Sequence, residues 1–265
     1  MRVGKIYVLE GPDGAGKTTM ANRIAKYLTK STPSIPTVVF SFPNPKGVLY
    51  EKIREKLKHN DSNYKDFIQQ MMIINMIDTI EKEVVPLLEK GINVIFDRWL
   101  VSSIVYNTLA KGTLLYSFAV SLNENRRYDK VNLTHMALSL LNDKITIPSK
   151  IFYIELPFEL LKQHSINRMK DKDVEVNDTY EKVIGINCMY QEVYNAFVGK
   201  GMEKEEINLG YLGIPKLVSL TDIRRFDRHI KVSYQVPKGK ELVERNVYEY
   251  IFRTLIKYIK DDLLK

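Results

Sequence analysis

Residues 11–18 of this 265-residue chain have the types and the spacing best suited to chemistry. They read Gly-Pro-Asp-Gly-Ala-Gly-Lys-Thr, the pattern G-x-x-x-x-G-K-S/T of a phosphate-binding loop. The glycines allow positive φ angles, so that consecutive N–H groups can turn toward an anion. Lys17 could reach the outer phosphates of a polyphosphate, and Thr18 could hold Mg²⁺ at the start of a helix whose dipole favours negative charge. The loop predicts a bound nucleoside triphosphate.

The residues on either side of this loop suit a phosphate-binding role. An apolar run rich in β-formers, residues 5–9, precedes it, and residues 19–30 follow with the apolar spacing of a helix. A strand, a glycine-rich loop and a helix in that order are the context that supports the motif. A glycine turn that only joins a strand to a helix is the alternative.

A second pair of chemically capable residues ends another apolar run, at Asp97 and Arg98. Phosphoryl transfer needs a carboxylate that supports the metal and positive charge around the moving group. Asp97 could accept a hydrogen bond from Thr18 or from water on Mg²⁺, and Arg98 could hold an acceptor phosphate through two hydrogen bonds. The spacing alone also fits a pair that caps the end of a strand.

Two further charged features each have two interpretations. Asp13 lies inside the loop, where its charge is unfavourable beside a polyphosphate unless it bonds a hydroxyl or a metal; otherwise it stabilises a turn. Residues 168–175 form a charge cluster after a predicted helix. This cluster is either a solvated turn or a mobile lid that brings Arg168, Lys170 or Lys172 onto the transferring phosphate.

The length and composition, with 45% hydrophobic and 27% charged residues, favour one α/β domain spanning residues 1–265, with at most a small second lobe as the alternative. Because Cys188 is the single cysteine, an internal disulfide is excluded and a cytoplasmic location is favoured. We expect Cys188 to be a packed residue of a helix. No signal peptide is visible and no run of 18 apolar residues occurs, so we expect no membrane span. The net charge of +8 suits anionic substrates and nucleic acid equally.

The apolar patterning predicts short strands separated by helices. The expected strands are residues 5–9, 37–42, 92–97, 150–156 and 230–234. The expected helices are residues 19–30, 48–58, 64–90, 102–111, 158–169, 177–197 and 246–264. The strand at 37–42 reads as buried, and the last helix as amphipathic with one apolar face: Val247, Tyr250, Ile251, Leu255, Tyr258 and Ile259. In a parallel sheet, residues 11–18, 41–45 and 97–98 would meet at one crevice.

Three segments together resemble the thymidylate kinase family of nucleoside monophosphate kinases. They are residues 9–19, residues 96–106 with Asp-Arg-Trp followed by Ser102, Ser103 and Tyr106, and residues 168–180. The resemblance covers residues 4–198 and resumes at the last strand and helix. It implies a P-loop NTPase three-layer α/β sandwich, with a five-stranded parallel sheet, helices on both faces and a lid at about residues 167–178.

The resemblance also implies ATP and Mg²⁺ as cofactors and a deoxynucleoside monophosphate, foremost dTMP, as acceptor. Asp13 would face the sugar hydroxyl, Arg98 would hold the 5′-phosphate and Tyr106 would pack near the deoxyribose. Arg168 would act on the transition state, because Gly14 leaves the loop without a second cation. The expected catalytic residues are Lys17, Asp13, Arg98 and Arg168. The expected ATP-binding residues are Gly11, Asp13, Gly14, Ala15, Gly16, Lys17, Thr18 and Thr19. The expected acceptor-binding residues are Asp13, Phe42, Arg98, Ser102, Tyr106 and Asn107, and the expected metal ligands are Thr18 and Asp97.

The chain departs from the family where the acceptor base would be read. Ser41 replaces an arginine, for which Lys46 could substitute, and Asn107 stands where many relatives have glutamine. The family's base-reading arginine falls at Ile77 or Met76 and its stacking aromatic at Ile73. A neutral pocket that reads a different or modified base could be built from Gln69, Gln70, Asn75 and Asp78.

Two other functions stay open from the sequence. One is a P-loop kinase for a modified pyrimidine nucleotide or for such a base in DNA, and the other is a non-catalytic nucleotide-binding protein. Residues 199–228, with Arg224, Arg225 and Arg228, interrupt the family pattern. They form a solvated insertion, an interface, a lid extension or a nucleic-acid contact. The resemblance favours nucleotide substrates and a homodimer; a nucleic-acid partner is disfavoured but stays open, and no membrane partner is expected.

Overall fold

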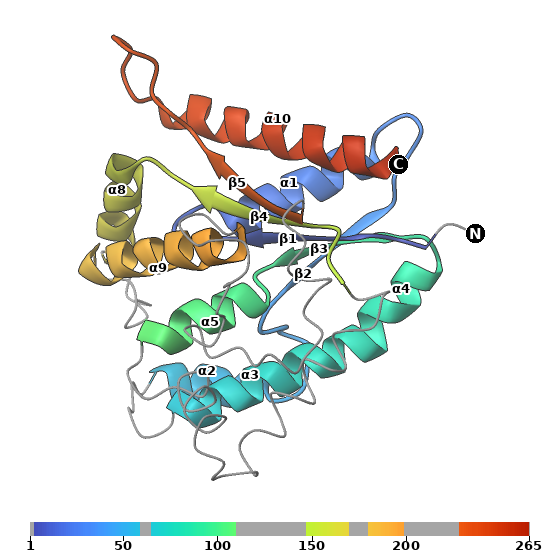
Figure 1. Ribbon diagram of the computed structural model, residues 1–265. Helices are drawn as coiled ribbons and strands as arrows, with labels where there is room; N and C mark the ends of the chain where they lie inside the picture. Colours follow the sequence, from blue (N-terminus) through green and yellow to red (C-terminus); the bar gives the residue numbers. More distant parts are fainter. Residues whose placement is uncertain (1–2, 59–64, 110–146, 170–179, 199–227, 265) are drawn as a thin grey trace.

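The computed structural model describes residues 3–58, 65–109, 147–169, 180–198 and 228–264. Its centre is one sheet of five parallel strands in the order β2-β3-β1-β4-β5 (Figure 1). The strands are β1 (Ile6–Glu10), β2 (Thr37–Ser41), β3 (Asn93–Asp97), β4 (Lys150–Glu155) and β5 (His229–Ser233). All five predicted strands are therefore present, each within one or two residues of its expected bounds.

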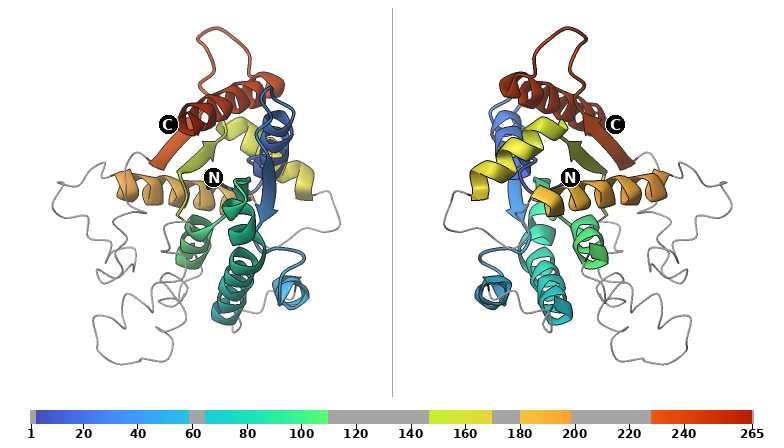
Figure 2. Two further views of the ribbon diagram at one scale, coloured as in Figure 1. Left: turned by 90° about the vertical axis from the view of Figure 1, so that its right-hand side faces the viewer. Right: turned by 90° about the vertical axis from the view of Figure 1, so that its left-hand side faces the viewer.

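Helices cover both faces of the sheet, as Figures 1 and 2 show. The helices are α1 (Lys17–Thr29), α2 (Tyr50–Lys58), α3 (Lys65–Thr79), the π-helix η2 (Ile80–Val84), α4 (Val85–Glu89), α5 (Leu100–Leu109), α8 (Phe158–Met169), α9 (Tyr180–Val198) and α10 (Glu244–Leu263). Helices α1 and α10 lie over one face, and α4, α5 and α9 lie over the other. This arrangement confirms the predicted three-layer P-loop NTPase fold.

The two layers of helices bury alternate residues of the central strand. In β1, Ile6 and Val8 pack in a core cluster with residues of α4, α5 and α9, whereas Tyr7 and Leu9 pack with residues of α1 and α10. Strands β1 and β3 are buried along their whole length. Because both of their faces are covered, they read as continuous apolar runs rather than as alternating ones.

Strand β2 differs from the prediction of a buried strand. Among the described residues, it forms the edge of the sheet and pairs only with β3, so most of its residues are half-buried or exposed. Val38 is 37% exposed. An apolar composition does not distinguish an edge strand from a central one, because neighbours along the sheet decide its burial.

Three predictions about helices also need correction. The region predicted as one helix, residues 64–90, contains the π-helix η2, which ends two residues before Pro86, a residue without an N–H to donate. Tyr250 and Tyr258 were expected on the apolar face of α10 but are 47% and 42% exposed, because their rings lie at the borders of that face. Cys188 lies in α9 as expected, but it is exposed rather than packed.

Several predictions fall outside the described residues. The structure does not describe the charge cluster after Met169 or most of the predicted lid at 167–178. Of the insertion at 199–228, it describes Arg228. Arg228 donates a hydrogen bond to the carbonyl oxygen of Pro148, so its side chain contacts the chain itself. Within the described residues, no helix is long and apolar enough to cross a membrane.

Candidate active site

The phosphate-binding loop connects β1 to α1, and its backbone requires glycine at particular positions. Gly11, Gly14 and Gly16 have φ angles of 149°, 82° and 77°. A Cβ atom at Gly11 would lie 2.6 Å from the carbonyl oxygen of Ile154, and one at Gly16 would lie 2.5 Å from the ring of Tyr248. A side chain at either position would therefore displace the neighbouring element as well as strain the loop.

Lys17 is buried at the start of α1 and bends back over the loop. Its Nζ donates a hydrogen bond of 2.7 Å to the carbonyl oxygen of Pro12. Burial, followed by the nearby guanidinium of Arg98, lowers the pKa of Lys17 to about 8. A polyphosphate in this loop would offer the ammonium group a stronger acceptor than a neutral carbonyl oxygen and would favour its charged form.

Thr18 and Asp97 meet beside the loop because β3 is the neighbour of β1. Asp97 lies opposite Leu9 in the sheet register, and its Oδ2 accepts a hydrogen bond from Thr18 Oγ1. The other carboxylate oxygen, Oδ1, is buried and has no hydrogen-bond partner among the described residues. A buried carboxylate oxygen without a donor is suited to a metal-bound water or a cation.

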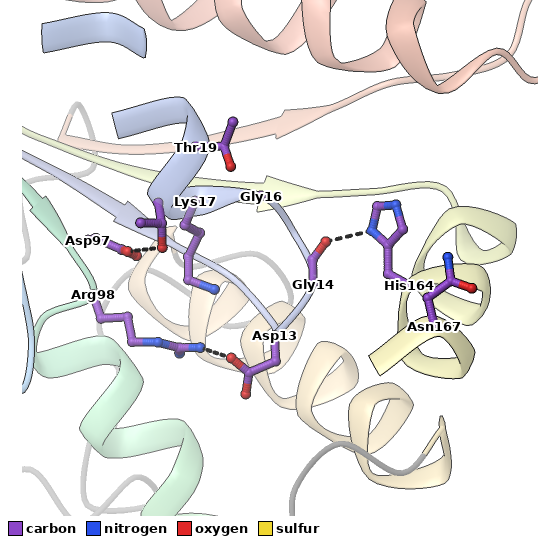
Figure 3. A pocket seen from close by; sticks show the side chains of 10 residues that line it. Asp13, Gly14, Gly16, Lys17, Thr19, Asp97, Arg98, His164 and Asn167 are labelled. Atoms are coloured by element: carbon purple, nitrogen blue, oxygen red, sulfur yellow. Dashed lines mark hydrogen bonds and ion pairs between the residues drawn. The ribbon is translucent and has the colours of Figure 1, made fainter. Parts of the chain in front are cut away.

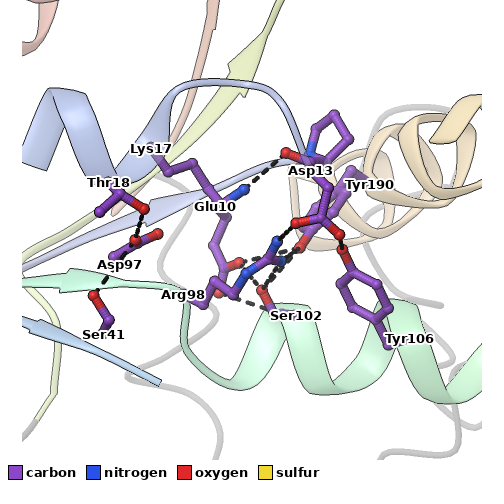
Figure 4. A network of polar contacts seen from close by, with 11 residues as sticks. Glu10, Asp13, Lys17, Thr18, Ser41, Asp97, Arg98, Ser102, Tyr106 and Tyr190 are labelled. Carbon is purple, nitrogen blue, oxygen red and sulfur yellow. Dashed lines mark hydrogen bonds and ion pairs between the residues drawn. The ribbon is translucent and has the colours of Figure 1, made fainter. Parts of the chain in front are cut away.

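Arg98 follows Asp97 and points toward the opposite side of the same loop (Figure 4). Its φ angle of 75° is unusual for a residue with a side chain, and its N–H donates to the carbonyl oxygen of Leu9 at 3.0 Å. Its guanidinium forms an ion pair with Asp13. The hydroxyl of Tyr106 donates to the second oxygen of Asp13 at 2.6 Å. The loop carboxylate thus links the residue that follows β3 to a residue of α5.

A buried carboxylate, Glu10, is connected by hydrogen bonds to the residues that hold the guanidinium of Arg98. It accepts hydrogen bonds from the N–H of Trp99 at 2.8 Å and from Ser102 Oγ at 2.5 Å. Ser102 Oγ lies 2.8 Å from the hydroxyl of Tyr190, and both hydroxyls accept from Arg98, at 3.4 and 3.3 Å. Burial raises the pKa of Glu10 to about 7 against the opposing effect of these donors. Glu10 therefore orients Arg98 through two hydroxyl groups.

These residues surround a cavity of about 450 Å³ (Figure 3). Its lining residues are Asp13, Gly14, Gly16, Lys17, Thr18, Thr19, Asp97, Arg98, His164 and Asn167. Eight of these ten were predicted from the sequence. His164 and Asn167 were missed, because they come from α8, whose place beside the loop depends on the fold and not on a local motif. Glu10 and Tyr190 were missed too, although a carboxylate at the end of an apolar strand was a visible signal for Glu10.

The remaining predicted residues lie elsewhere or are only partly described. Phe42 is buried, and its ring packs edge-to-face on Phe96 at 5.0 Å instead of lining the cavity. Ala15 is buried against the sheet. Arg168 belongs to α8 and Asn107 to α5, and the placement of both side chains lies outside what the structure describes.

Asn75 does not belong to a base-reading pocket, which corrects the prediction. Its amide accepts from the N–H of Asn44 at 2.7 Å and donates to the carbonyl oxygens of Asn44 and Val48 at 3.1 and 2.8 Å. The side chain is buried, and its hydrogen bonds hold the segment that follows β2. Asp78 forms an ion pair with Lys82 in the next turn. The side chains of Gln69 and Gln70 are not among the described residues.

Comparisons with known proteins find similarity to thymidylate kinases. A family model described as thymidylate kinase matches residues 9–133. The chain is 29% identical over 171 residues to thymidylate kinase from Thermosipho africanus, which covers 63% of this chain and 71% of that protein. It is 34% identical over 121 residues to the enzyme of the same name from Carboxydothermus hydrogenoformans, covering 43% of this chain and 57% of that protein. The match thus spans little more than half of the second relative.

Two solved structures share the fold. Thymidylate kinase from Candida albicans superposes with a TM-score of 0.53 at 17% identity, covering 98% of this chain and 92% of that one. Thymidylate kinase from Ehrlichia chaffeensis superposes with a TM-score of 0.54 at 16% identity, covering 97% of this chain and 99% of that one.

Proposed function

We propose that this chain, which resembles the thymidylate kinase family over residues 9–133, is a member of that family and transfers the γ-phosphoryl group of ATP to dTMP, giving ADP and dTDP. One observation carries the proposal. Lys17 and Thr18, which suit the donor, line the same cavity of about 450 Å³ as Asp13 and Arg98, which suit an acceptor. Phosphoryl transfer depends mainly on positioning and on neutralising charge, and this cavity offers both.

The donor half consists of the loop and the start of α1. The N–H groups of the glycine-rich turn and the helix N-terminus favour the β- and γ-phosphates. Lys17 would exchange the carbonyl oxygen of Pro12 for a phosphate oxygen and neutralise charge there. Burial lowers the pKa of Lys17 to about 8, and a phosphate anion beside the amine would oppose this effect and favour the protonated form.

The residues present fit a magnesium ion. Thr18 and Asp97 supply a hydroxyl and a carboxylate, and Oδ1 of Asp97 has no partner among the described residues. No group of three or more His, Cys, Asp or Glu side chains that could hold a metal occurs in the described part of the chain. Mg²⁺ commonly uses one or two protein ligands together with phosphate oxygens and water. When bound, it would neutralise charge on the β- and γ-phosphates.

The acceptor half consists of Asp13, Arg98 and Tyr106. Arg98 would hold the 5′-phosphate, and Asp13 would accept a hydrogen bond from the sugar hydroxyl. An oxygen of that phosphate forms the new bond to the γ-phosphorus, while the bond from the γ-phosphorus to the bridging oxygen breaks and ADP leaves. The attacking phosphate is already an anion, so no general base is needed. Arg168 is our candidate for the transition-state arginine.

A second candidate is a kinase for a modified pyrimidine nucleotide. Ile73 and Met76, at positions where the family has an aromatic ring and an arginine, are apolar and buried in α3. A base edge that needs a cationic partner would find none in these side chains. The choice between the two candidates concerns the base alone, because the phosphate and sugar contacts would be the same.

ADP release measured across dTMP, dUMP, 5-substituted dUMP, dCMP, dGMP and dAMP tests the proposal. We expect dTMP to give the highest kcat/KM. A preference for a 5-substituted dUMP would favour the second candidate, and ATP binding without any transfer would indicate a non-catalytic protein. Lys17→Ala should abolish turnover, whereas Lys26→Ala, an exposed lysine of the same helix, should not. Wild-type turnover in Lys17→Ala would contradict the proposal.

Location and assembly complete the proposal. A cytoplasmic location agrees with the free, exposed thiol of Cys188, because reducing compartments preserve such thiols. A homodimer rests on the family resemblance. Sedimentation of the purified chain tests it, and a single species with the 30.8 kDa mass of one chain would contradict it.

A further inference from the structure

His164 joins the phosphate-binding loop to two helices. Its Nδ1 lies 2.8 Å from the carbonyl oxygen of Gly14, and its Nε2 lies 3.0 Å from a carboxylate oxygen of Glu244, in the first turn of α10. Figure 3 shows His164 reaching from α8 toward the loop. The ring of Tyr248 stacks on the imidazole, with 6.3 Å between the ring centres and 8° between the planes. The imidazole is thus fixed on three sides.

Both partners of the imidazole accept hydrogen bonds, and neither can donate one. A neutral imidazole has a single N–H, so it satisfies only one of them, whereas the imidazolium form satisfies both. Among the described residues, Glu244 and Tyr248 from α10 contact the ring, and the charged residues Asp13, Lys17, Asp97 and Arg98 line the same cavity. Burial raises the pKa of Tyr248 to about 12, so its hydroxyl remains neutral. The ring can donate to both acceptors at once only in its imidazolium form.

Gly14 is shaped for this contact. Its φ angle is 82°, and a Cβ atom there would lie 3.2 Å from the Cβ atom of His164. Any other residue would press on α8 and strain the loop, so the carbonyl oxygen of Gly14 meets the imidazole closely only because glycine is present. His164 also lines the cavity, where a positive charge favours a polyphosphate.

We propose that His164 is a positioning residue that, when protonated, holds the phosphate-binding loop in the form that binds ATP. The inference rests on the proposed function only in naming ATP as the ligand. When the imidazolium loses one proton, Glu244 keeps the remaining N–H, because a hydrogen bond to a carboxylate is stronger than one to a carbonyl oxygen. The loop then loses its tie to α8. Protonation therefore favours ATP binding, and affinity decreases as pH rises.

Three substitutions separate the two contacts of the ring. The amide nitrogen of His164→Asn lies about where Nδ1 lies and can still donate to Gly14. The amide nitrogen of His164→Gln lies about where Nε2 lies and can donate only to Glu244. Glu244→Gln can donate to Nε2, so that a neutral imidazole keeps its N–H on Gly14. Gln163→Asn, an exposed neighbour in α8, is the matched control.

Calorimetric titration of the full chain with ATP, at about pH 6 and about pH 8, tests the proposal. We expect the Kd of His164→Gln to rise about tenfold at the lower pH, and that of His164→Asn to stay within about twofold of wild type. From about pH 6 to about pH 8, the ATP affinity of wild type should decrease more than that of Glu244→Gln. The comparison of the two proteins cancels the titration of ATP itself. Gln163→Asn should follow wild type.

Two results would overturn the inference: equal ATP affinity of wild type and His164→Gln, or an unchanged pH response in Glu244→Gln. Nitrogen NMR of the ring gives a second readout that does not depend on activity. At about pH 6 both nitrogens of His164 should carry protons, and a single protonated nitrogen there would also overturn it. If ATP affinity behaves as expected but dTMP is not phosphorylated, the proposed function fails and this inference stands.

Discussion

Replacing Glu10 by Gln should make the protein more stable at alkaline pH and leave its stability unchanged at acidic pH. Glu10 is fully buried, and one of its oxygens accepts from the N–H groups of Trp99 and Ser102. The other oxygen faces the hydroxyls of Ser102 and Tyr190, which can also accept. A glutamine amide can therefore reproduce the contacts of the protonated carboxyl group, with its NH₂ on the hydroxyl side.

The magnitude follows from the pKa of Glu10, which burial raises from 4.5 to about 7. A carboxyl group with a raised pKa binds its proton more tightly in the folded protein, so its contribution to stability is complete below pH 4.5. This contribution is lost as pH rises through about 7. The full difference corresponds to about 3 kcal/mol in the free energy of unfolding. The glutamine of Glu10→Gln does not titrate, so the variant should keep this contribution to the free energy of unfolding above about pH 7.

Urea unfolding of wild type and Glu10→Gln at about pH 5 and about pH 8 measures the effect. The variant should match wild type at the lower pH and exceed it by up to about 3 kcal/mol at the higher one. Glu89→Gln, an exposed carboxylate at the end of α4, should track wild type at both. An equal difference between wild type and Glu10→Gln at the two pH values would refute the reasoning.

Three further substitutions probe the site and its support. Tyr106→Phe removes the hydroxyl that donates to Asp13. In steady-state assays kcat/KM for the acceptor should fall about tenfold, and the KM for ATP should stay unchanged. A rise in the KM for ATP, with kcat/KM for the acceptor unchanged, would contradict this role of Tyr106. Asp97→Asn removes a charge beside Thr18, so the Mg²⁺ concentration for half-maximal rate should rise about tenfold or more, and an unchanged magnesium titration would count against that role. Asn75→Ala leaves the backbone at Asn44 and Val48 without partners, so urea unfolding should show a loss of about 2–4 kcal/mol; a loss below about 0.5 kcal/mol would show that water replaces the amide.

The sequence predicted the parts of this protein that depend on local patterns. The apolar run before residues 11–18, the glycine spacing and the helix after them are all encoded within about thirty residues, so strand, loop and helix could be placed together. Asp97 and Arg98 could be assigned to the same crevice because parallel strands end at one edge. These predictions needed no knowledge of which helices pack where.

Residues whose role depends on distant partners could not be predicted. His164 meets Gly14 across 150 positions of the chain, and Tyr190 meets Ser102 across 88, so no spacing along the sequence reveals either contact. Asn75 was misassigned for a related reason. A buried amide can bind a base or a stretch of backbone equally well, and only the path of the chain after β2 decides between them.

The backbone of Arg98 shows why Glu10 belongs to the site although it does not line the cavity of about 450 Å³. A left-handed conformation at a residue with a side chain costs on the order of 1–3 kcal/mol, and it persists only where surrounding contacts enforce it. The N–H of Arg98 is held by Leu9, and its guanidinium by Asp13 and by the hydroxyls of Ser102 and Tyr190. Those hydroxyls are in turn oriented by Glu10. The guanidinium has five donors, so it can keep these contacts and still offer N–H groups to an acceptor phosphate. A cation fixed before the substrate arrives needs no rearrangement during phosphoryl transfer, and this is the form of electrostatic stabilisation that accelerates reactions most.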